Sequence, residues 1–291
     1  MKWPTKTELF GKQSKNAGEL MKIAVAGKGG VGKTTLTSML ARSFAKEGMR
    51  VLAIDADPDA NLAGALGVSP ENREKLVPIA NMKDLAIERT GHGSGYGGFF
   101  VLNPTVDDLP EALSIKHEGI RILSLGSIRH GGSGFVCPQH TIVRALMNHI
   151  LLKENDLVLM DMEAGIEHLG RGTAEAVDLL IIVVEPGRRS LETAAQIERL
   201  AKDLGIENLA YVGSKLRDSA DMDFLSNALP NERFLGGIQL SDAIRTADLN
   251  DLSPFDQDDA PLSQIKDIQS RIQALGAKIN AKANTHVPDE N

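Results

Sequence analysis

Residues 22–35 read KIAVAGKGGVGKTT and join an apolar run, a glycine-rich loop and the start of a helical pattern. The run 22–26 is almost wholly apolar, which predicts a strand buried on both faces. The loop that follows has the spacing G-x-x-x-x-G-K-[ST], and residues 33–46 have the apolar spacing of a helix. A loop of this kind, placed between a strand and a helix, is typical of sites that bind phosphate groups.

The residues of this loop have separate expected tasks. Glycines allow backbone angles that side chains forbid, so that consecutive N–H groups can face phosphate oxygens at the helix N-terminus. Lys33 is expected to reach the terminal phosphates, and the Thr34 hydroxyl is expected to hold Mg²⁺. The predicted nucleotide contacts in the loop are Gly27, Gly29, Gly30, Val31, Gly32, Lys33, Thr34 and Thr35.

The rest of the chain alternates apolar runs with helical patterns. Continuously apolar runs occur at residues 51–55, 120–126, 157–161, 179–185 and 209–213, and helical patterns include residues 141–152 and 191–204. Such alternation predicts an α/β fold in which a mostly parallel central sheet is flanked by helices on both faces. In folds of this class, ligands bind beyond the carboxyl ends of the strands.

Composition and charge exclude several functional classes. The chain has 291 residues, a formal net charge of −7 and one cysteine. The acidic balance argues against a nucleic-acid partner, and no apolar run approaches the roughly 20 residues that span a bilayer. A single cysteine excludes an intramolecular disulfide and fits a reducing compartment, so a cytoplasmic location is expected.

The two ends of the chain differ from its middle. Residues 1–20 are polar and lysine-rich, and we expect a flexible N-terminal extension, with Met21 as the original start. Residues 21–281, which include the phosphate loop, are expected to form a single domain. Residues 282–291 form a polar tail that should fray.

Lys28 is the charged loop residue that a phosphate site does not explain, because Lys33 already supplies the positive charge. The stretch KGGVGKT (residues 28–34) resembles the deviant P-loop of the Fe-protein, MinD and ParA class of ATPases. In that class the early lysine crosses a dimer interface to the partner's nucleotide. The resemblance therefore implies a homodimer when ATP is bound, in which Lys28 acts in trans like an arginine finger.

The same resemblance assigns roles to polar residues at two strand ends. In DADPDANL (residues 55–62), Asp57 matches the switch carboxylate that orients the attacking water, and Asn61 falls where a second polar switch residue sits. Asp161, which closes LVLMD, matches the acidic residue that holds Mg²⁺ through water. With Thr34, Asp57 and Asp161 form the predicted magnesium site.

Three further stretches narrow the resemblance to one group of this class. DMEAGIEHLGRGTA (161–174), VVEPGRRSLETA (183–194) and GGFFVLNPTVDDLP (97–110) resemble the CooC-type accessory ATPases, which mature nickel-containing carbon monoxide dehydrogenase. The similarity runs from about Met21 to about Ala277. It implies a slow ATPase that uses ATP, ADP and Mg²⁺. It also implies a maturation factor or metallochaperone for nickel insertion, with a client metalloenzyme such as carbon monoxide dehydrogenase.

The metal-binding stretch of the CooC-type group is incomplete in this chain. GSGFVCPQH (132–140) has Phe135 where the group has the first cysteine of a C-x-C pair, so a symmetric dimer built on Cys137 offers two sulfurs. A closed four-coordinate site for Ni²⁺ or Zn²⁺ at the dimer interface needs two more ligands, and His140 could supply them. His130 is a less well placed ligand. Alternatively, Cys137 is a small core residue and His140 is a solvated residue in the first helical turn. With one cysteine per chain, a dimer cannot share a four-iron cluster.

VGSKL (212–216) is the second stretch in which this chain differs from the CooC-type group. Ser214 and Lys215 are expected on the base side of the nucleotide, where the group usually has asparagine before the lysine. A serine makes fewer contacts with adenine than an amide does. Residues 236–248 resemble the group's base-side loop and could compensate.

Two other functions remain open. A MinD- or ParA-like positioning ATPase needs a membrane helix or a basic DNA-binding face. The apolar residues of the last helical pattern have the spacing of core packing: Leu262, Ile265, Ile268, Ile272, Leu275 and Ile279. The third function is that of a paralogue that binds nucleotide and a protein partner without metal.

Overall fold

The fold is taken from a computed structural model that describes residues 21–57, 59–91, 101–126, 138–149, 156–163, 166, 174, 177–257 and 261–285. The predicted extension, residues 1–20, lies outside this set. The last helix, α12 (Leu262–Thr285), ends four residues into the stretch 282–291 that is predicted to be a polar tail.

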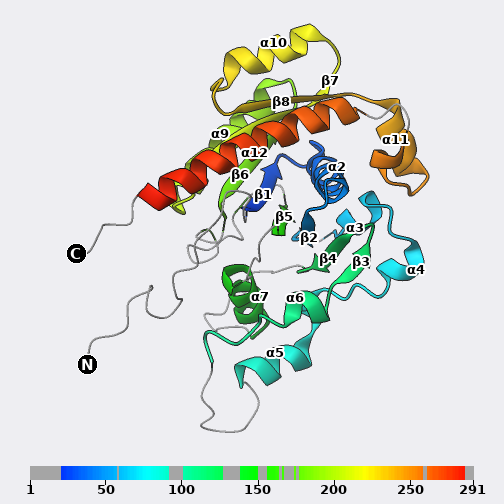
Figure 1. Cartoon of the computed structure of the whole chain (residues 1–291), viewed down its shortest axis with the longest axis vertical. Coiled ribbons are helices and arrows are strands. Elements are labelled where there is room, and N and C mark those ends of the chain that lie inside the picture. The colour runs from blue at the N-terminus through cyan, green and yellow to red at the C-terminus, as the bar shows by residue number, and fades with distance from the viewer. Residues whose placement is uncertain are drawn as a thin grey trace.

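The described strands form one sheet in the order β3-β4-β2-β5-β1-β6-β7-β8 (Figure 1). All neighbouring pairs are parallel except β3 with β4. The predicted mostly parallel sheet is therefore confirmed. The strands are β1 (Met21–Gly27), β2 (Arg50–Asp55), β3 (Ile115–His117), β4 (Ile120–Ser124), β5 (Asp156–Asp161), β6 (Leu179–Val184), β7 (Leu209–Leu216) and β8 (Phe234–Gln239).

Helices cover both faces of the sheet (Figure 1). The α-helices are α2 (Lys33–Lys46), α3 (Leu62–Ala65), α4 (Pro70–Arg73), α5 (Lys83–Thr90), α6 (Leu109–Ala112), α7 (Pro138–His149), α9 (Arg188–Asp203), α10 (Ser219–Ala228), α11 (Asp242–Leu249) and α12 (Leu262–Thr285). Short 3₁₀ helices are η1 (Ile79–Asn81) and η2 (Pro254–Asp256). Residues of α5, α6, α7, α9 and α10 pack in the core on one face, and residues of α2, α3, η2 and α12 pack on the other.

The central strands are buried on both faces because their side chains alternate between two cores. In β1, Ala24 and Ala26 belong to one core, whereas Ile23 and Val25 belong to the other. Every residue of β6 is buried. This explains why the runs read as continuously apolar in the sequence.

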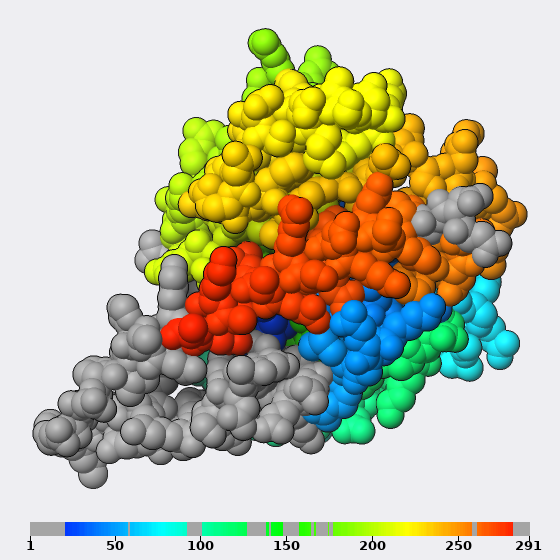
Figure 2. Space-filling model, turned by 45° about the horizontal axis from the view of Figure 1, so that its top comes forward, coloured from blue at the N-terminus to red at the C-terminus, as the bar shows by residue number. Residues whose placement is uncertain are grey.

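The last helix uses its apolar stripe for core packing, as its spacing predicts. Ile265, Ile268 and Ile272 are at most 1% exposed and belong to the core that α2 also lines. Figure 2 shows α12, in orange and red, crossing the surface between α10 and α2. No helix within the described ranges is long and apolar enough to span a bilayer.

Helix and strand boundaries follow the predictions most closely near the glycine-rich loop. The helix predicted at 33–46 is α2 with the same limits. Strand β7 continues past the predicted run to Leu216, so Ser214 and Lys215 lie within a strand. Helix α7 begins at Pro138, which puts the backbone of His140 in its first turn.

Candidate nucleotide site

The glycine-rich loop links the central strand β1 to α2 through backbone that tolerates few side chains. Gly32 caps α2 with φ 100°, and its carbonyl accepts a hydrogen bond from the N–H of Leu36 at 3.0 Å. A Cβ added at Gly32 would lie 2.9 Å from the Ser214 hydroxyl oxygen, and one at Gly27 would lie 2.6 Å from the carbonyl oxygen of Val183. Glycine is therefore required at both ends of the loop.

The N-terminus of α2 is suited to an anion. Its first turn carries no acidic residue, and the first N–H groups of a helix have no partner within the helix. Lys33, the first residue of the helix, is only 7% exposed, while Thr34 is half-buried. A phosphate placed here would meet backbone donors and a lysine at the positive end of the helix.

Two aspartates lie side by side at neighbouring strand ends next to this loop. Asp55 of β2 pairs in register with Asp161 of β5, and Asp161 also pairs with Val25 of β1. Each aspartate is 1% exposed. The parallel sheet thus brings two buried carboxyls and the phosphate loop together, as the strand order requires.

Asp161 is a buried carboxyl whose two oxygens have no hydrogen-bond partner within the described ranges. Burial raises its pKa to about 7, and the charges of Asp55 and Asp57 act in the same direction. Thr34 and Lys33 lower this pKa, although the Thr34 hydroxyl does not meet hydrogen-bond geometry with the carboxyl. Unpartnered oxygens beside a threonine hydroxyl are the donor set that Mg²⁺ prefers, so these residues fit that ion.

Asp55 is a site residue that the sequence reasoning missed. One carboxyl oxygen accepts from the N–H of Asp57 at 3.1 Å, and the other accepts from the N–H of Leu62 at 2.8 Å. Burial raises its pKa to about 6, and these two backbone hydrogen bonds oppose the rise. Asp55 therefore anchors both ends of the segment that carries Asp57. The sequence feature that marks Asp55 is its place as the acidic last residue of the apolar run 51–55.

Asp57 and Asn61 lie on this anchored segment and are more open to solvent than Asp55. Asp57 is half-buried, and its carboxyl accepts a hydrogen bond from the N–H of Asp59 at 3.0 Å. Asn61 is exposed and precedes α3. Asp57 is thus beside the buried pair but outside the core.

Lys28 is paired with an acidic residue that the sequence reasoning also missed. Its ammonium lies 3.4 Å from Oε1 of Glu185, which follows β6. Lys215 lies 3.8 Å from Oε2 of the same carboxylate and also donates a hydrogen bond to the carbonyl oxygen of Gly30. Glu185 could have been noticed as the acidic end of a buried run, but its two partners depend on the sheet order.

Ser214 and Lys215, predicted to face the base, both contact the phosphate loop. Ser214 is 7% exposed and packs against Gly32. Lys215 has a left-handed backbone, φ 58°, which is unusual for a residue with a side chain. Residues 236–248 comprise the end of β8 and most of α11, and the N–H of Leu240 donates to the carbonyl of Leu216 at 2.8 Å.

The predicted transition-metal ligands are only partly described. Cys137, with Phe135 and His130, lies outside the described residues. The backbone of His140 belongs to α7. In the ranges that the structure covers, no group of three or more His, Cys, Asp or Glu side chains is arranged to hold a metal ion.

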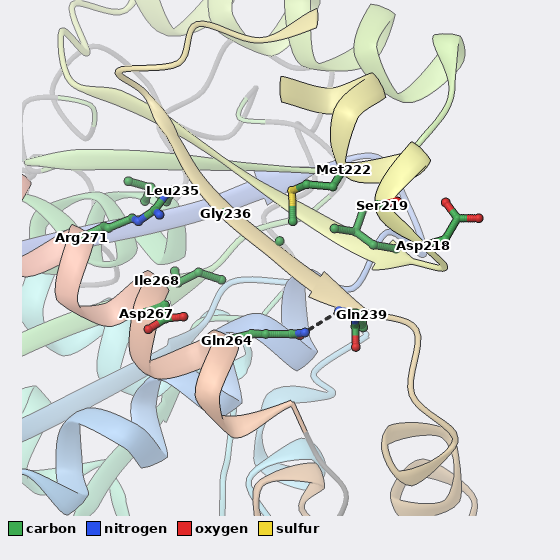
Figure 3. Close-up of a pocket in the computed structure, with 12 residues that line it drawn as sticks. Asp218, Ser219, Met222, Leu235, Gly236, Gln239, Gln264, Asp267, Ile268 and Arg271 are labelled. Carbon is green, nitrogen blue, oxygen red and sulfur yellow. Dashed lines mark hydrogen bonds between the residues drawn. The ribbon is translucent and has the colours of Figure 1, made fainter. Parts of the chain in front are cut away.

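A separate hollow of about 400 Å³ lies between α10, β8 and α12 (Figure 3). Met222 and Ile268 line it on the two sides of β8. Near the ends of the strand, the N–H of Gln239 donates to Gln264 at 2.9 Å and Arg271 donates to the carbonyl of Phe234 at 3.5 Å. These contacts protect the edge of the sheet. No residue of the glycine-rich loop lines this hollow.

Known proteins share this fold and much of this sequence. Residues 22–255 match the family described as the CobQ/CobB/MinD/ParA nucleotide binding domain. The carbon monoxide dehydrogenase accessory protein CooC of Rhodospirillum rubrum is 55% identical over 81% of this chain and 90% of its own length. An uncharacterized ATP-binding protein of Methanocaldococcus jannaschii is 46% identical over 73% of this chain and 81% of its own length.

Solved structures agree on the fold. MinD of Aquifex aeolicus, in its MinC:MinD complex, has a TM-score of 0.62 at 20% identity, covering 88% of this chain and 96% of that one. A plasmid partition protein of Borrelia burgdorferi bound to AMPPNP has a TM-score of 0.64 at 16% identity, covering 88% of this chain and all of its own. The chain is therefore an ATPase that belongs to the CobQ/CobB/MinD/ParA nucleotide-binding family and, within it, to the CooC-type accessory ATPases.

Proposed function

We propose that this ATPase is a maturation factor for carbon monoxide dehydrogenase, and that it works by closing as a homodimer around ATP and Mg²⁺. The observation that carries the proposal is a second lysine, Lys28, in an otherwise complete phosphate loop of a chain closely similar to CooC. Lys28 is 41% exposed, so it is accessible to a second chain. Closure by ATP and reopening after hydrolysis would give a cycle that a client enzyme can use.

In this proposal, each loop residue has a defined role in hydrolysis. Lys33 and the N–H groups of the loop hold the terminal phosphates, and Thr34 and Asp161 hold Mg²⁺, which neutralises phosphate charge. Asp57 orients a water molecule whose oxygen bonds to the γ-phosphorus as the bond to the β-phosphate oxygen breaks. Lys28 of the partner chain stabilises the charge that develops on the transferred group.

A Lys28→Ala variant tests the trans role. It should bind ATP nearly as tightly as the wild type, because Lys33 and the loop backbone remain. Its turnover should fall by about 10³-fold, the lower range for removal of an arginine finger. Nucleotide affinity is measured by calorimetry and turnover by phosphate release. Turnover equal to that of the wild type would show that Lys28 has no role in hydrolysis.

Nickel or zinc capture is proposed to be weak, at one ion per dimer, because each chain contributes Cys137 and His140 and lacks a cysteine at position 135. Equilibrium dialysis with Ni²⁺ and Zn²⁺ measures it. Cys137→Ala and His140→Ala should each reduce binding, and Phe135→Cys should increase it. Tight binding that survives both alanine changes would mean that other residues are the ligands.

A second candidate is an ATPase that binds nucleotide and a protein partner without carrying metal. Phe135 at the position of a missing thiolate favours it. The dialysis experiment separates the two candidates, since this one predicts no Ni²⁺ or Zn²⁺ bound in the presence of ATP.

A further inference from the structure

Glu185 holds two lysines that come from different parts of the chain. One carboxylate oxygen faces Lys28 of the phosphate loop at 3.4 Å, and the other faces Lys215 of β7 at 3.8 Å. Lys215 also donates to the carbonyl oxygen of Gly30. The carboxylate and the two ammonium groups therefore connect the loop after β1, the end of β6 and the end of β7.

The sheet fixes the position of Glu185. Val183 pairs with Gly27, so Lys28, directly after Gly27, and Glu185, two residues after Val183, emerge at the same edge of the sheet. On the other side, Val184 pairs with Gly213, which brings Lys215 close. The N–H of Glu185 donates to the Ser190 hydroxyl at 3.0 Å, which ties the residue to the start of α9. The contact with Lys28 thus follows from register.

We propose that Glu185 is a positioning residue that holds Lys28 against its own chain, and that Lys28 exchanges this carboxylate for the partner's nucleotide when the dimer closes. The inference rests on the trans role of Lys28 in the proposed function. Lys28 cannot occupy both positions at once, so the pair with Glu185 opposes closure. Glu185 thereby sets how much ATP and protein are needed for dimerisation.

Lys215 makes the exchange feasible. When Lys28 leaves, Glu185 keeps one ammonium partner and is not left unpaired. The pair with Lys28 is also open to solvent, since the side chains of Lys28 and Glu185 are 41% and 31% exposed. Pairs of this kind are weak, so Glu185 should tune dimerisation and not block it.

A Glu185→Gln variant tests the inference through the monomer–dimer constant. In saturating ATP and Mg²⁺, sedimentation velocity should show dimers forming at about two- to thirtyfold lower protein concentration than in the wild type, the range expected when each dimer breaks two exposed ion pairs. The difference should shrink in high salt, which screens the pair. Glu185→Asp keeps the charge and should stay closer to the wild type. Glu192→Gln, at an exposed position of α9, controls for net charge.

The double variant Lys28→Ala/Glu185→Gln separates positioning from a general structural effect. If Glu185 acts through Lys28, Glu185→Gln should not change dimerisation in the Lys28→Ala background. A dimer constant that is unchanged or weakened by Glu185→Gln in the wild-type background would overturn the inference, as would an equal gain in both backgrounds. If Lys28→Ala alone dimerises and hydrolyses like the wild type, the proposed trans role fails instead.

Discussion

At the scale of single residues, the site buries the carboxyl of Asp161, whose ionised form is unfavourable there without a cation. Asp161 is buried, and its oxygens have no hydrogen-bond partner among the described groups. Its pKa of about 7 in the folded chain exceeds the ordinary value of 3.8, because burial disfavours the charged form. The stability that this group contributes is fully present below pH 3.8 and is lost as the pH rises through 7.

Asp161→Asn should therefore stabilise the protein at alkaline pH when nucleotide and Mg²⁺ are removed. Relative to the variant, the wild type should lose about 3 kcal/mol of unfolding free energy between pH 5 and pH 8. The slope is about 1.4 kcal/mol for each pH unit over which the unfolded carboxyl is ionised and the folded one is protonated. Urea unfolding in EDTA at several pH values measures this. Asp59→Asn, at an exposed position, is the control. Parallel pH profiles for the wild type and Asp161→Asn would contradict the expected effect of burial.

Two glycines of the loop should respond differently to the same substitution. Gly32→Ala should lower the free energy of unfolding by about 1–3 kcal/mol, because φ is 100° and the new Cβ would meet Ser214 at 2.9 Å. Gly29→Ala adds a Cβ with no atom within 4 Å and should change stability little. Ser214→Ala should recover part of the loss in Gly32→Ala, since only the steric part is relieved. Equal losses at positions 29 and 32 would contradict this geometry.

The loop was predictable at this scale because its spacing and its setting are both local. Glu185 was not, since its two lysine partners come from other parts of the sheet and depend on register. Asp55 was not, since its place beside Asp161 depends on the pairing of β2 with β5. Lys215 was predicted at the base side of the nucleotide. Its left-handed backbone and its hydrogen bond to Gly30 could not be predicted from the stretch VGSKL alone.

At the scale of elements, the long last helix is part of the core. Ile268→Ala should lower the unfolding free energy by about 2–4 kcal/mol, as large-to-small changes in cores do, because Ile268 is 1% exposed. Lys266→Ala on the exposed side of α12 should change it by less than about 0.5 kcal/mol. Thermal or urea unfolding measures both. A loss at Ile268 no larger than that at Lys266 would mean that the apolar stripe is free for another partner.

The strands at the centre of the sheet have clearer sequence patterns than the strands at its two edges. Strands β1 and β6 were predictable because burial on both faces makes them continuously apolar. Strand β3 is three residues long and antiparallel, and β8 contains two adjacent glycines, so neither has a strong pattern. Helix α7 starts before its apolar pattern because Pro138 is well suited to the first helical turn.

At the scale of the whole molecule, the parallel sheet gathers residues that are distant in sequence at one edge. Lys28, Asp57, Asp161 and Glu185 follow or end four different strands, and the order β2-β5-β1-β6 makes those strands neighbours. The side chain of Lys28 is 41% exposed, and we propose that two such edges meet through this residue. The central claim is that a complete hydrolytic site contains residues from two chains.

Mixed dimers of Lys28→Ala and Asp57→Ala test that claim most directly. Each variant alone should be almost inactive, because every site lacks one of the two residues. In a mixed dimer, the Lys28→Ala chain keeps Asp57 and receives Lys28 from its partner, so one site is complete. An equal mixture should regain about a quarter of wild-type turnover, since half of randomly formed dimers are mixed and one of their two sites works. Phosphate release from the mixture that stays at the level of the separate variants would contradict a lysine acting between chains.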